Sequence, residues 1–198
     1  RTFRDKANIA KLLTKLEAQQ GISYAPMQRQ TLELALKNQL LVITGGPGTG
    51  KTTSIRAILA MFDEIGIKTL LCAPTGRAAK RMTELTGRDA ATVHRMLGAK
   101  FDEDNDRVVF TKDESDRLDC DAVILDECSM VDICLMDALL CALPPDARLI
   151  MVGDADQLPS VGPGNVFSAL IRSQVVATVR LTEIFRQTGD SRIIRNAH

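Results

Sequence analysis

A glycine-rich segment, Gly45–Thr52, has the residue types and the spacing of a phosphate-binding loop. It reads GGPGTGKT and fits the pattern G-x-x-x-x-G-K-[ST], in which glycines let backbone N–H groups turn toward phosphate oxygens. Lys51 would add a positive charge for the β- and γ-phosphates, and Thr52 would offer a hydroxyl to Mg²⁺. A helix expected to begin at Lys51 would direct the positive end of its dipole at the same anion. The segment predicts a site for a nucleoside triphosphate and Mg²⁺, formed by Gly46, Pro47, Gly48, Thr49, Gly50, Lys51, Thr52 and Thr53.

Two adjacent acids, Asp126 and Glu127, follow the apolar run VIL and supply the second half of such a site. At the carboxyl end of a buried strand, Asp126 would hold the Mg²⁺ shell, and Glu127 would orient and deprotonate an attacking water. Taken alone, the pair is better explained by a loop that solvates two acids, because such a pair after apolar residues is common. Its position after a phosphate loop in the same strand–helix pattern favours the catalytic interpretation.

The elements that must position these groups alternate along the chain. Short, continuously apolar runs predict buried parallel strands, and the amphipathic stretches between them predict helices. Such alternation is typical of an α/β fold with a parallel sheet flanked by helices. The expected strands are 39–44, 68–73, 121–126, 148–153 and 177–181, and the expected helices are 2–19, 26–36, 51–65, 76–85, 132–143 and 165–172.

Residues 98–119 interrupt this alternation. Two β-like runs, Ala99–Phe101 and Val108–Thr111, flank the turn-rich tetrad Glu103–Asp106 and predict a small β-hairpin on the surface. Charge also divides here, since residues 68–100 carry seven bases and two acids, whereas residues 101–121 carry nine acids and three bases. Two solvated faces would give the same composition, so charge alone does not decide the partner.

The composition is that of one globular domain. The 198 residues are 45% hydrophobic and 25% charged, a composition that excludes a disordered chain. Because the net charge is zero, any binding to nucleic acid must use a local basic patch. No apolar run approaches the length of a membrane span, and the start of the chain lacks a secretory signal. Most of the five cysteines are expected to be buried thiols of a reducing cytoplasm. The chain lacks an initiator Met and stops within a helical pattern, so we expect it to be a fragment of a longer protein.

Six blocks in order resemble the superfamily 1 DNA helicases, most closely the RecD/TraA group that includes the alpha subunit of exodeoxyribonuclease V. The blocks are GGPGTGKTT, APTGRAAKRM, TVHRML, VILDECSMVD, VGDADQLPSVGPG and LTEIFRQ. The resemblance implies a RecA-like P-loop NTPase domain over residues 24–198, the first of two motor domains (1A), preceded by a helix over residues 1–23. It also implies that the inserted hairpin is a pin at the duplex fork. Its acidic turn suits a pin that separates strands sterically without gripping them, or only a decorated loop.

The resemblance assigns roles around the nucleotide, which would be ATP with Mg²⁺. It implies that Gln28 reads the adenine edge, that Gln157 senses the γ-phosphate, and that Arg186 reaches that phosphate from within the same domain. Many relatives have alanine where this chain has Cys128, a change that a buried site should tolerate. The implied catalytic residues are Lys51, Glu127, Gln157 and Arg186, and the implied metal ligands are Thr52 and Asp126.

The DNA-facing residues fall in three blocks. Small residues, a hydroxyl and a helix start at 74–77 suit contact with single-strand phosphates, and TVHRML resembles a second such block. His94 is equally explained as a packed structural histidine. One tyrosine and no tryptophan leave few stacking platforms, so backbone contacts with strong salt dependence are expected. The candidates are Pro74, Thr75, Gly76, Arg77, Thr92, His94, Arg95, Pro159 and Val161.

By resemblance, the chain would be the ATP-binding motor domain of a 5′-to-3′ DNA helicase acting in repair and recombination. Its implied partners are single-stranded DNA, a duplex fork, a second motor domain of the same parent chain and other nuclease or helicase subunits, with no membrane. Alone, it should bind nucleotide weakly, hydrolyse little and unwind nothing. Two alternatives are the motor module of a conjugative relaxase–helicase and a nucleotide-dependent DNA-binding switch without helicase activity.

Overall fold

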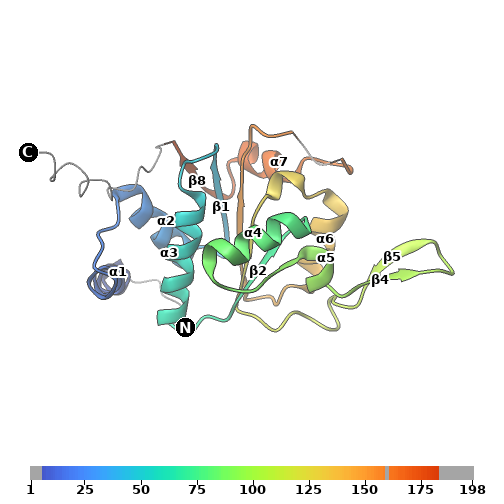
Figure 1. The fold of residues 1–198 in the computed structure, drawn as a ribbon, viewed down its shortest axis with the longest axis horizontal. Helices are drawn as coiled ribbons and strands as arrows, with labels where there is room; N and C mark the ends of the chain where they lie inside the picture. The colour runs from blue at the N-terminus through green and yellow to red at the C-terminus, as the bar shows by residue number, and fades with distance from the viewer. Residues whose placement is uncertain (1–5, 159–160, 183–198) are drawn as a thin grey trace, which may run out of the picture.

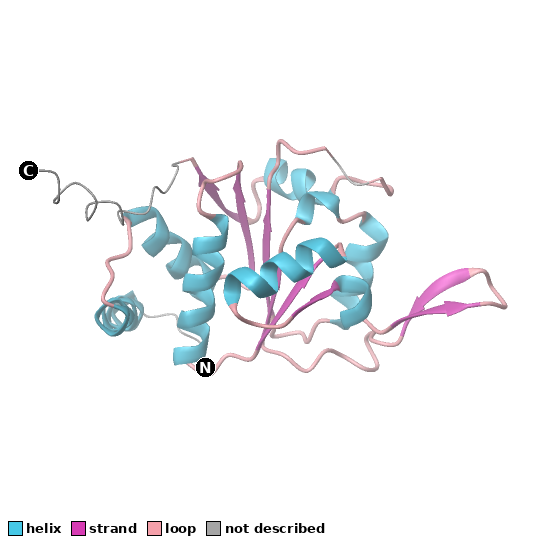
Figure 2. Ribbon diagram, in the orientation of Figure 1, coloured by secondary structure: helices cyan, strands magenta, loops and turns pink. Residues whose placement is uncertain are grey.

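The computed structural model describes residues 6–158 and 161–182. A six-stranded parallel sheet, in the order β3-β2-β6-β7-β1-β8, lies between two helical layers (Figures 1 and 2). Its strands are β1 (Leu40–Gly45), β2 (Thr69–Ala73), β3 (Ala90–Thr92), β6 (Ala122–Leu125), β7 (Arg148–Gly153) and β8 (Ala177–Leu181). The helices are α1 (Lys6–Gln20), α2 (Pro26–Lys37), α3 (Lys51–Glu64), α4 (Gly76–Thr86), α5 (Val93–Met96), α6 (Ile133–Ala142) and α7 (Val166–Ser173), with a 3-10 turn η1 (Cys128–Met130).

The central strands are apolar throughout because both faces of the sheet are covered. Along β1, Leu41 and Ile43 join a core with α1, α2 and α3, whereas Val42 joins a second core with α5, α6 and α7. Strand side chains point alternately to opposite faces, so a continuous apolar run fills both cores. This pattern explains why these strands could be predicted as buried and parallel.

The strand register brings several loops to one edge of the sheet. Thr44 pairs with Gly153, and Leu125 pairs with Met151, so β1, β7 and β6 end close together. The loops that follow these strands start at Gly46, Asp126 and Asp154. Since parallel strands share a carboxyl edge, the phosphate loop and the acid pair belong to the same face of the molecule.

The sequence-based prediction missed β3 and α5. Ala90–Thr92 has only three residues, all half-buried, so it has neither an apolar run nor a clear alternation. It becomes a strand because its backbone pairs with the edge of β2, with Leu71 opposite Ala90. The five predicted strands and six predicted helices are otherwise confirmed within a few residues at their ends, and residues 1–5 lie outside the described part.

The predicted hairpin is confirmed as β4 (Ala99–Asp102) paired with antiparallel β5 (Arg107–Phe110). It forms its own two-stranded sheet and projects from the body of the domain (Figure 1). Its strands leave Phe101 and Val108, which are cross-strand partners, largely exposed. Whether it acts as a pin stays a prediction.

The amphipathic helix predicted at the start of the chain is also confirmed. Ile9, Leu13 and Leu16 of α1 are buried in the same core as Ile55 and Phe62 of α3. The proposed division between residues 23 and 24 stays a prediction. Within the described ranges, no helix combines the length and the apolar character that a membrane crossing requires.

All five cysteines are free thiols. Cys72, Cys120 and Cys128 are buried as predicted, and Cys141 is half-buried. Cys134 is exposed, because it lies on the solvent side of α6, next to the exposed Ile133.

Candidate nucleotide-binding site

The phosphate loop joins β1 to the start of α3. Gly48 and Gly50 have φ angles of 75° and 94°, a left-handed conformation that glycine adopts without the steric cost of a side chain. Thr49 is buried, and its hydroxyl donates a hydrogen bond to the carbonyl oxygen of Gly46 at 2.8 Å. Lys51 Nζ donates to the carbonyl oxygens of Gly45 and Gly46 at 2.6 and 2.9 Å. The loop is therefore organised by its own side chains as well as by its glycines.

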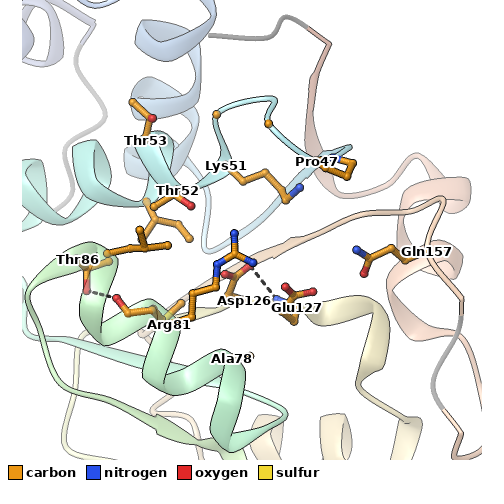
Figure 3. Close-up of a pocket in the computed structure, with 15 residues that line it drawn as sticks. Pro47, Lys51, Thr52, Thr53, Ala78, Arg81, Thr86, Asp126, Glu127 and Gln157 are labelled. Atoms are coloured by element: carbon orange, nitrogen blue, oxygen red, sulfur yellow. Dashed lines mark hydrogen bonds between the residues drawn. The ribbon is translucent and has the colours of Figure 1, made fainter. Parts of the chain in front are cut away.

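A cavity of about 650 Å³ opens beside this loop. Its size is within the range of small-molecule sites. Figure 3 shows Lys51, Asp126, Glu127 and Gln157 around it, from three different loops. Of the residues predicted to bind nucleotide or metal, the cavity is lined by Pro47, Gly48, Gly50, Lys51, Thr52, Thr53, Asp126, Glu127 and Gln157.

The acid pair sits where β6 ends. The N–H of Asp126 donates to the carbonyl oxygen of Cys72 at 3.0 Å, which fixes the strand end against β2. The N–H of Glu127 donates to Asp126 Oδ1 at 2.8 Å. Glu127 has φ 54° and ψ 38°, a left-handed conformation that costs a non-glycine residue about 1–3 kcal/mol and is often found at functional sites.

Burial raises the pKa of Asp126 above its ordinary value, and the charge of Glu127 acts in the same direction. The hydrogen bond from the Glu127 N–H and the positive charges of Lys51 and Arg81 oppose that rise. A half-buried carboxylate next to a second carboxylate is stabilised by a cation. The cavity therefore favours positive charge beside Asp126.

The donor chemistry fits Mg²⁺. The Thr52 hydroxyl and the Asp126 carboxylate are oxygen ligands that line one cavity with the lysine of the phosphate loop. Mg²⁺ prefers oxygen ligands and binds through one or two protein groups together with substrate phosphates. This arrangement suits a nucleotide that carries Mg²⁺ between Thr52 and Asp126.

Gln157 is placed by a contact that sequence reasoning missed. Ser129, in the turn after the acid pair, is buried, and its hydroxyl donates to Gln157 Oε1 at 3.2 Å. The loop after β7 is closed by Asp154, whose Oδ1 accepts a hydrogen bond from the Asp156 N–H at 3.0 Å. In the block DECS, the two acids indicate the catalytic site, whereas the serine makes the contact with Gln157.

Arg81 is a second residue that sequence reasoning did not assign. It lies on α4, within the basic stretch and the block APTGRAAKRM, and lines the cavity. Figure 3 shows its side chain extending from α4 toward Asp126 and Glu127.

Three predicted nucleotide-binding residues do not line the cavity, namely Gln28, Gly46 and the buried Thr49. Gln28 is at the third position of α2, outside the cavity lining, and its Oε1 accepts a hydrogen bond from the Ala25 N–H at 2.9 Å. That bond caps α2, and the adenine contact stays a prediction. Gly46 contributes its carbonyl oxygen to Lys51 and Thr49 without lining the cavity. Arg186 lies outside the described residues.

The first two predicted DNA-facing blocks emerge side by side. Ala73 pairs with Thr92 at the carboxyl ends of β2 and β3, so the segments that begin at Pro74 and at Thr92 are neighbours. The Thr75 hydroxyl caps α4 by accepting from the Ala78 N–H at 3.2 Å, and the Thr92 hydroxyl caps α5 by accepting from the Arg95 N–H at 3.1 Å. Both hydroxyls therefore shape a helix start.

The other DNA-facing candidates divide between a structural contact and open surface. His94 is exposed, and its ring lies 5.8 Å from that of Phe110, a contact that links α5 to the hairpin. Gly76, Arg77, Arg95 and Val161 are exposed. Pro159 lies outside the described residues. DNA contact by this set stays a prediction.

A parallel sheet with a phosphate loop after β1 and a carboxylate pair after β6 defines a P-loop NTPase domain with a RecA-like fold. The model of the AAA domain family matches residues 28–163. The chain belongs to this family, and its relatives include RecD-type helicases.

The relatives carry that assignment. The chain is 41% identical over 182 residues to the "ATP-dependent RecD2 DNA helicase" of Deinococcus radiodurans, covering 92% of this chain and 24% of that protein. It is 40% identical over 167 residues to the "RecBCD enzyme subunit RecD" of Mycobacterium tuberculosis, covering 73% of this chain and 28% of that protein. The chain thus spans about a quarter of the length of these curated relatives.

Solved structures support the fold. The Pif1 helicase from Candida albicans matches with a TM-score of 0.57 and 25% identity, over 87% of this chain and 43% of that one. Bacteroides Pif1 bound to ssDNA matches with a TM-score of 0.57 and 24% identity, over 84% of this chain and 43% of that one. The predicted resemblance and the predicted RecA-like fold are both confirmed.

Proposed function

We propose that this chain is the ATP-binding motor domain of an ATP-dependent DNA helicase that couples hydrolysis to movement along single-stranded DNA and to duplex unwinding. The observation that carries the proposal is the single cavity that joins Lys51 and Thr52 to Asp126, Glu127 and Gln157. The names of the RecD2 and RecD relatives support the helicase class.

Each residue of the cavity has a task in this proposal. Lys51 and the N–H groups of the loop bind the β- and γ-phosphates, while Thr52 and Asp126 hold Mg²⁺. When bound, Mg²⁺ neutralises the charge that develops on the phosphates. Glu127 orients the attacking water and accepts its proton. Gln157, held by Ser129, senses the γ-phosphate.

Three further roles complete the proposal. Gln28 reads the adenine edge, Arg186 reaches the γ-phosphate, and the starts of α4 and α5 contact DNA phosphates together with the loop around Pro159 and Val161. Two helices that begin side by side at one edge of the sheet suit contact with the extended, negatively charged backbone of DNA.

The wider setting follows the relatives. We propose 5′-to-3′ movement, action in DNA repair or recombination in the cytoplasm, and a second motor domain of the parent chain that closes over the nucleotide. The RecBCD naming of one relative supports further nuclease or helicase subunits as partners. Alone, this stretch should bind nucleotide weakly, with little hydrolysis and no unwinding, because half of the motor is supplied by that second domain.

The test is ATP hydrolysis by the full parent chain with and without single-stranded DNA, beside Lys51→Ala. We expect DNA to stimulate hydrolysis, and the variant to lose nucleotide affinity while it keeps DNA affinity. Hydrolysis indifferent to DNA would contradict the motor. Nucleotide-dependent DNA binding without duplex unwinding would instead favour a binding switch. Strong DNA-stimulated hydrolysis by this stretch alone would contradict the expected dependence on a second domain.

A further inference from the structure

Helix α4 presents one face to the cavity, and a single charge interrupts that face. Ala78, Met82 and Leu85 line the cavity at helical spacing, as an amphipathic helix would present its apolar side. Arg81 lies on the same face and lines the same cavity. An arginine in this row is not needed to pack the helix, so its charge is the feature that requires an explanation.

Lys80 and Arg81 are both exposed cations of this helix, but they have different neighbours. Lys80 is 81% exposed at its side chain and lies 4.0 Å from Glu84, its partner one turn along the helix. Arg81 instead extends toward Asp126 and Glu127 in Figure 3. Its positive charge acts on Asp126 from outside the phosphate loop, in addition to the charge of Lys51.

The same helix begins at the proposed DNA contact. Thr75 caps α4, and Arg77 is exposed one turn before Arg81. Residues four apart lie on one side of a helix, about 6 Å apart along its axis. A helix of this length moves as a rigid unit, so a shift imposed on its first turn by DNA also shifts Arg81 relative to the acid pair.

We propose that Arg81 is a positioning residue that couples DNA contact on α4 to the carboxylates of the nucleotide site. Before DNA binds, the positive charge of the guanidinium lies beside Asp126 in the shared cavity and opposes the arrival of Mg²⁺ there. When DNA engages the first turn of α4, Arg81 withdraws and the carboxylates become available to Mg²⁺ and water. This inference rests on the proposed function, because it assigns a regulator to that site.

The experiment uses the full parent chain with Arg81→Met, Arg81→Lys and the matched control Lys80→Met. The first readout is equilibrium binding of a fluorescent, non-hydrolysable ATP analogue over a Mg²⁺ titration without DNA. Removing one positive charge near a divalent site should lower the half-saturating Mg²⁺ concentration roughly three- to tenfold in Arg81→Met. Arg81→Lys should stay between Arg81→Met and the unsubstituted chain, and Lys80→Met should match the unsubstituted chain.

The second readout is the ratio of ATP hydrolysis with and without oligo(dT). Arg81→Met should lower this ratio about threefold or more by raising the DNA-independent rate, because the restraint is lost. Its affinity for oligo(dT) without nucleotide should equal that of Lys80→Met. If Arg81 only stabilised the helix, Arg81→Met and Lys80→Met would not differ in the Mg²⁺ titration or in the hydrolysis ratio.

Two results would overturn the assignment of Arg81. One is Arg81→Met that matches Lys80→Met in both the Mg²⁺ titration and the hydrolysis ratio. The other is loss of analogue binding at every Mg²⁺ concentration, which would make Arg81 a direct nucleotide ligand. If the unsubstituted chain hydrolyses ATP without regard to DNA, the proposed function itself fails and this inference fails with it.

Discussion

Gly45→Ala should damage the site through backbone packing alone. A Cβ at residue 45 would lie 2.5 Å from Thr49 Oγ1 and 2.8 Å from the carbonyl oxygen of Leu181. Both distances are shorter than a Cβ normally keeps from an oxygen atom. The Leu181 oxygen belongs to β8, which pairs with β1 at this position and cannot move aside. Overpacking costs about 1–3 kcal/mol. Displacing the Thr49 hydroxyl from Gly46 adds about 1 kcal/mol.

The free energy of unfolding should therefore fall by about 2–4 kcal/mol. At about 2–4 °C per kcal/mol for a domain of this size, the melting temperature should drop by roughly 4–16 °C. The assay is thermal and urea unfolding followed by circular dichroism, with affinity for a fluorescent ATP analogue measured in parallel. That affinity should fall because the loop is displaced from the cavity.

Gly46→Ala is the matched control for stability. A Cβ there would meet no atom within 4 Å, and residue 46 does not have the positive φ of its neighbours Gly48 and Gly50. Its stability should stay unchanged or rise by up to about 1 kcal/mol. Equal melting temperatures for the two variants would refute the reasoning about the close approach of β1 and β8.

Three further predictions concern catalysis, DNA contact and pH. Glu127→Gln in the full parent chain should keep nucleotide affinity while the hydrolysis rate falls by about 10²- to 10⁴-fold; an unchanged rate would remove Glu127 from the reaction. Arg77→Ala should weaken binding to single-stranded DNA and reduce its dependence on salt by about one released counterion; titrations at several salt concentrations that give parallel lines would contradict this contact. Arg29 and the Tyr24 N–H hold the pKa of Glu17 below its ordinary 4.5, so Glu17 contributes stability at neutral pH that is lost as pH falls below that value. Urea unfolding of Glu17→Gln should show a shallower loss of stability below pH 4.5, and identical acid profiles would refute the linkage.

The sequence predicted the elements whose pattern is imposed by burial on both faces. Strands β1, β6 and β7 are apolar because two helical layers cover them. A continuous apolar run of this kind can be recognised from the sequence alone. The phosphate loop and the acid pair were recognised because their chemistry demands particular residue types. The register that joins them depends on the order of the strands, which the residues do not specify locally.

The residues that were missed depend on contacts between distant segments. Ser129 gains its role from Gln157, which lies 28 positions along the chain and is brought close by the pairing of β6 with β7. Arg81 is one of seven bases in a basic stretch, and only the packing of α4 beside the cavity distinguishes it. β3 exists because β2 offers a free edge. Such features follow from tertiary arrangement and carry no local pattern.

The central claim is that one cavity holds the triphosphate of ATP between the loop after β1 and the acids after β6. A crystal structure with Mg²⁺ and a non-hydrolysable ATP analogue would test it most directly. The account predicts the β-phosphate within the loop, Lys51 turned from the carbonyl oxygens of Gly45 and Gly46 to the phosphates, and Mg²⁺ between Thr52 and Asp126. A nucleotide bound elsewhere, or Asp126 directed away from Thr52 with the loop filled by side chains, would contradict it.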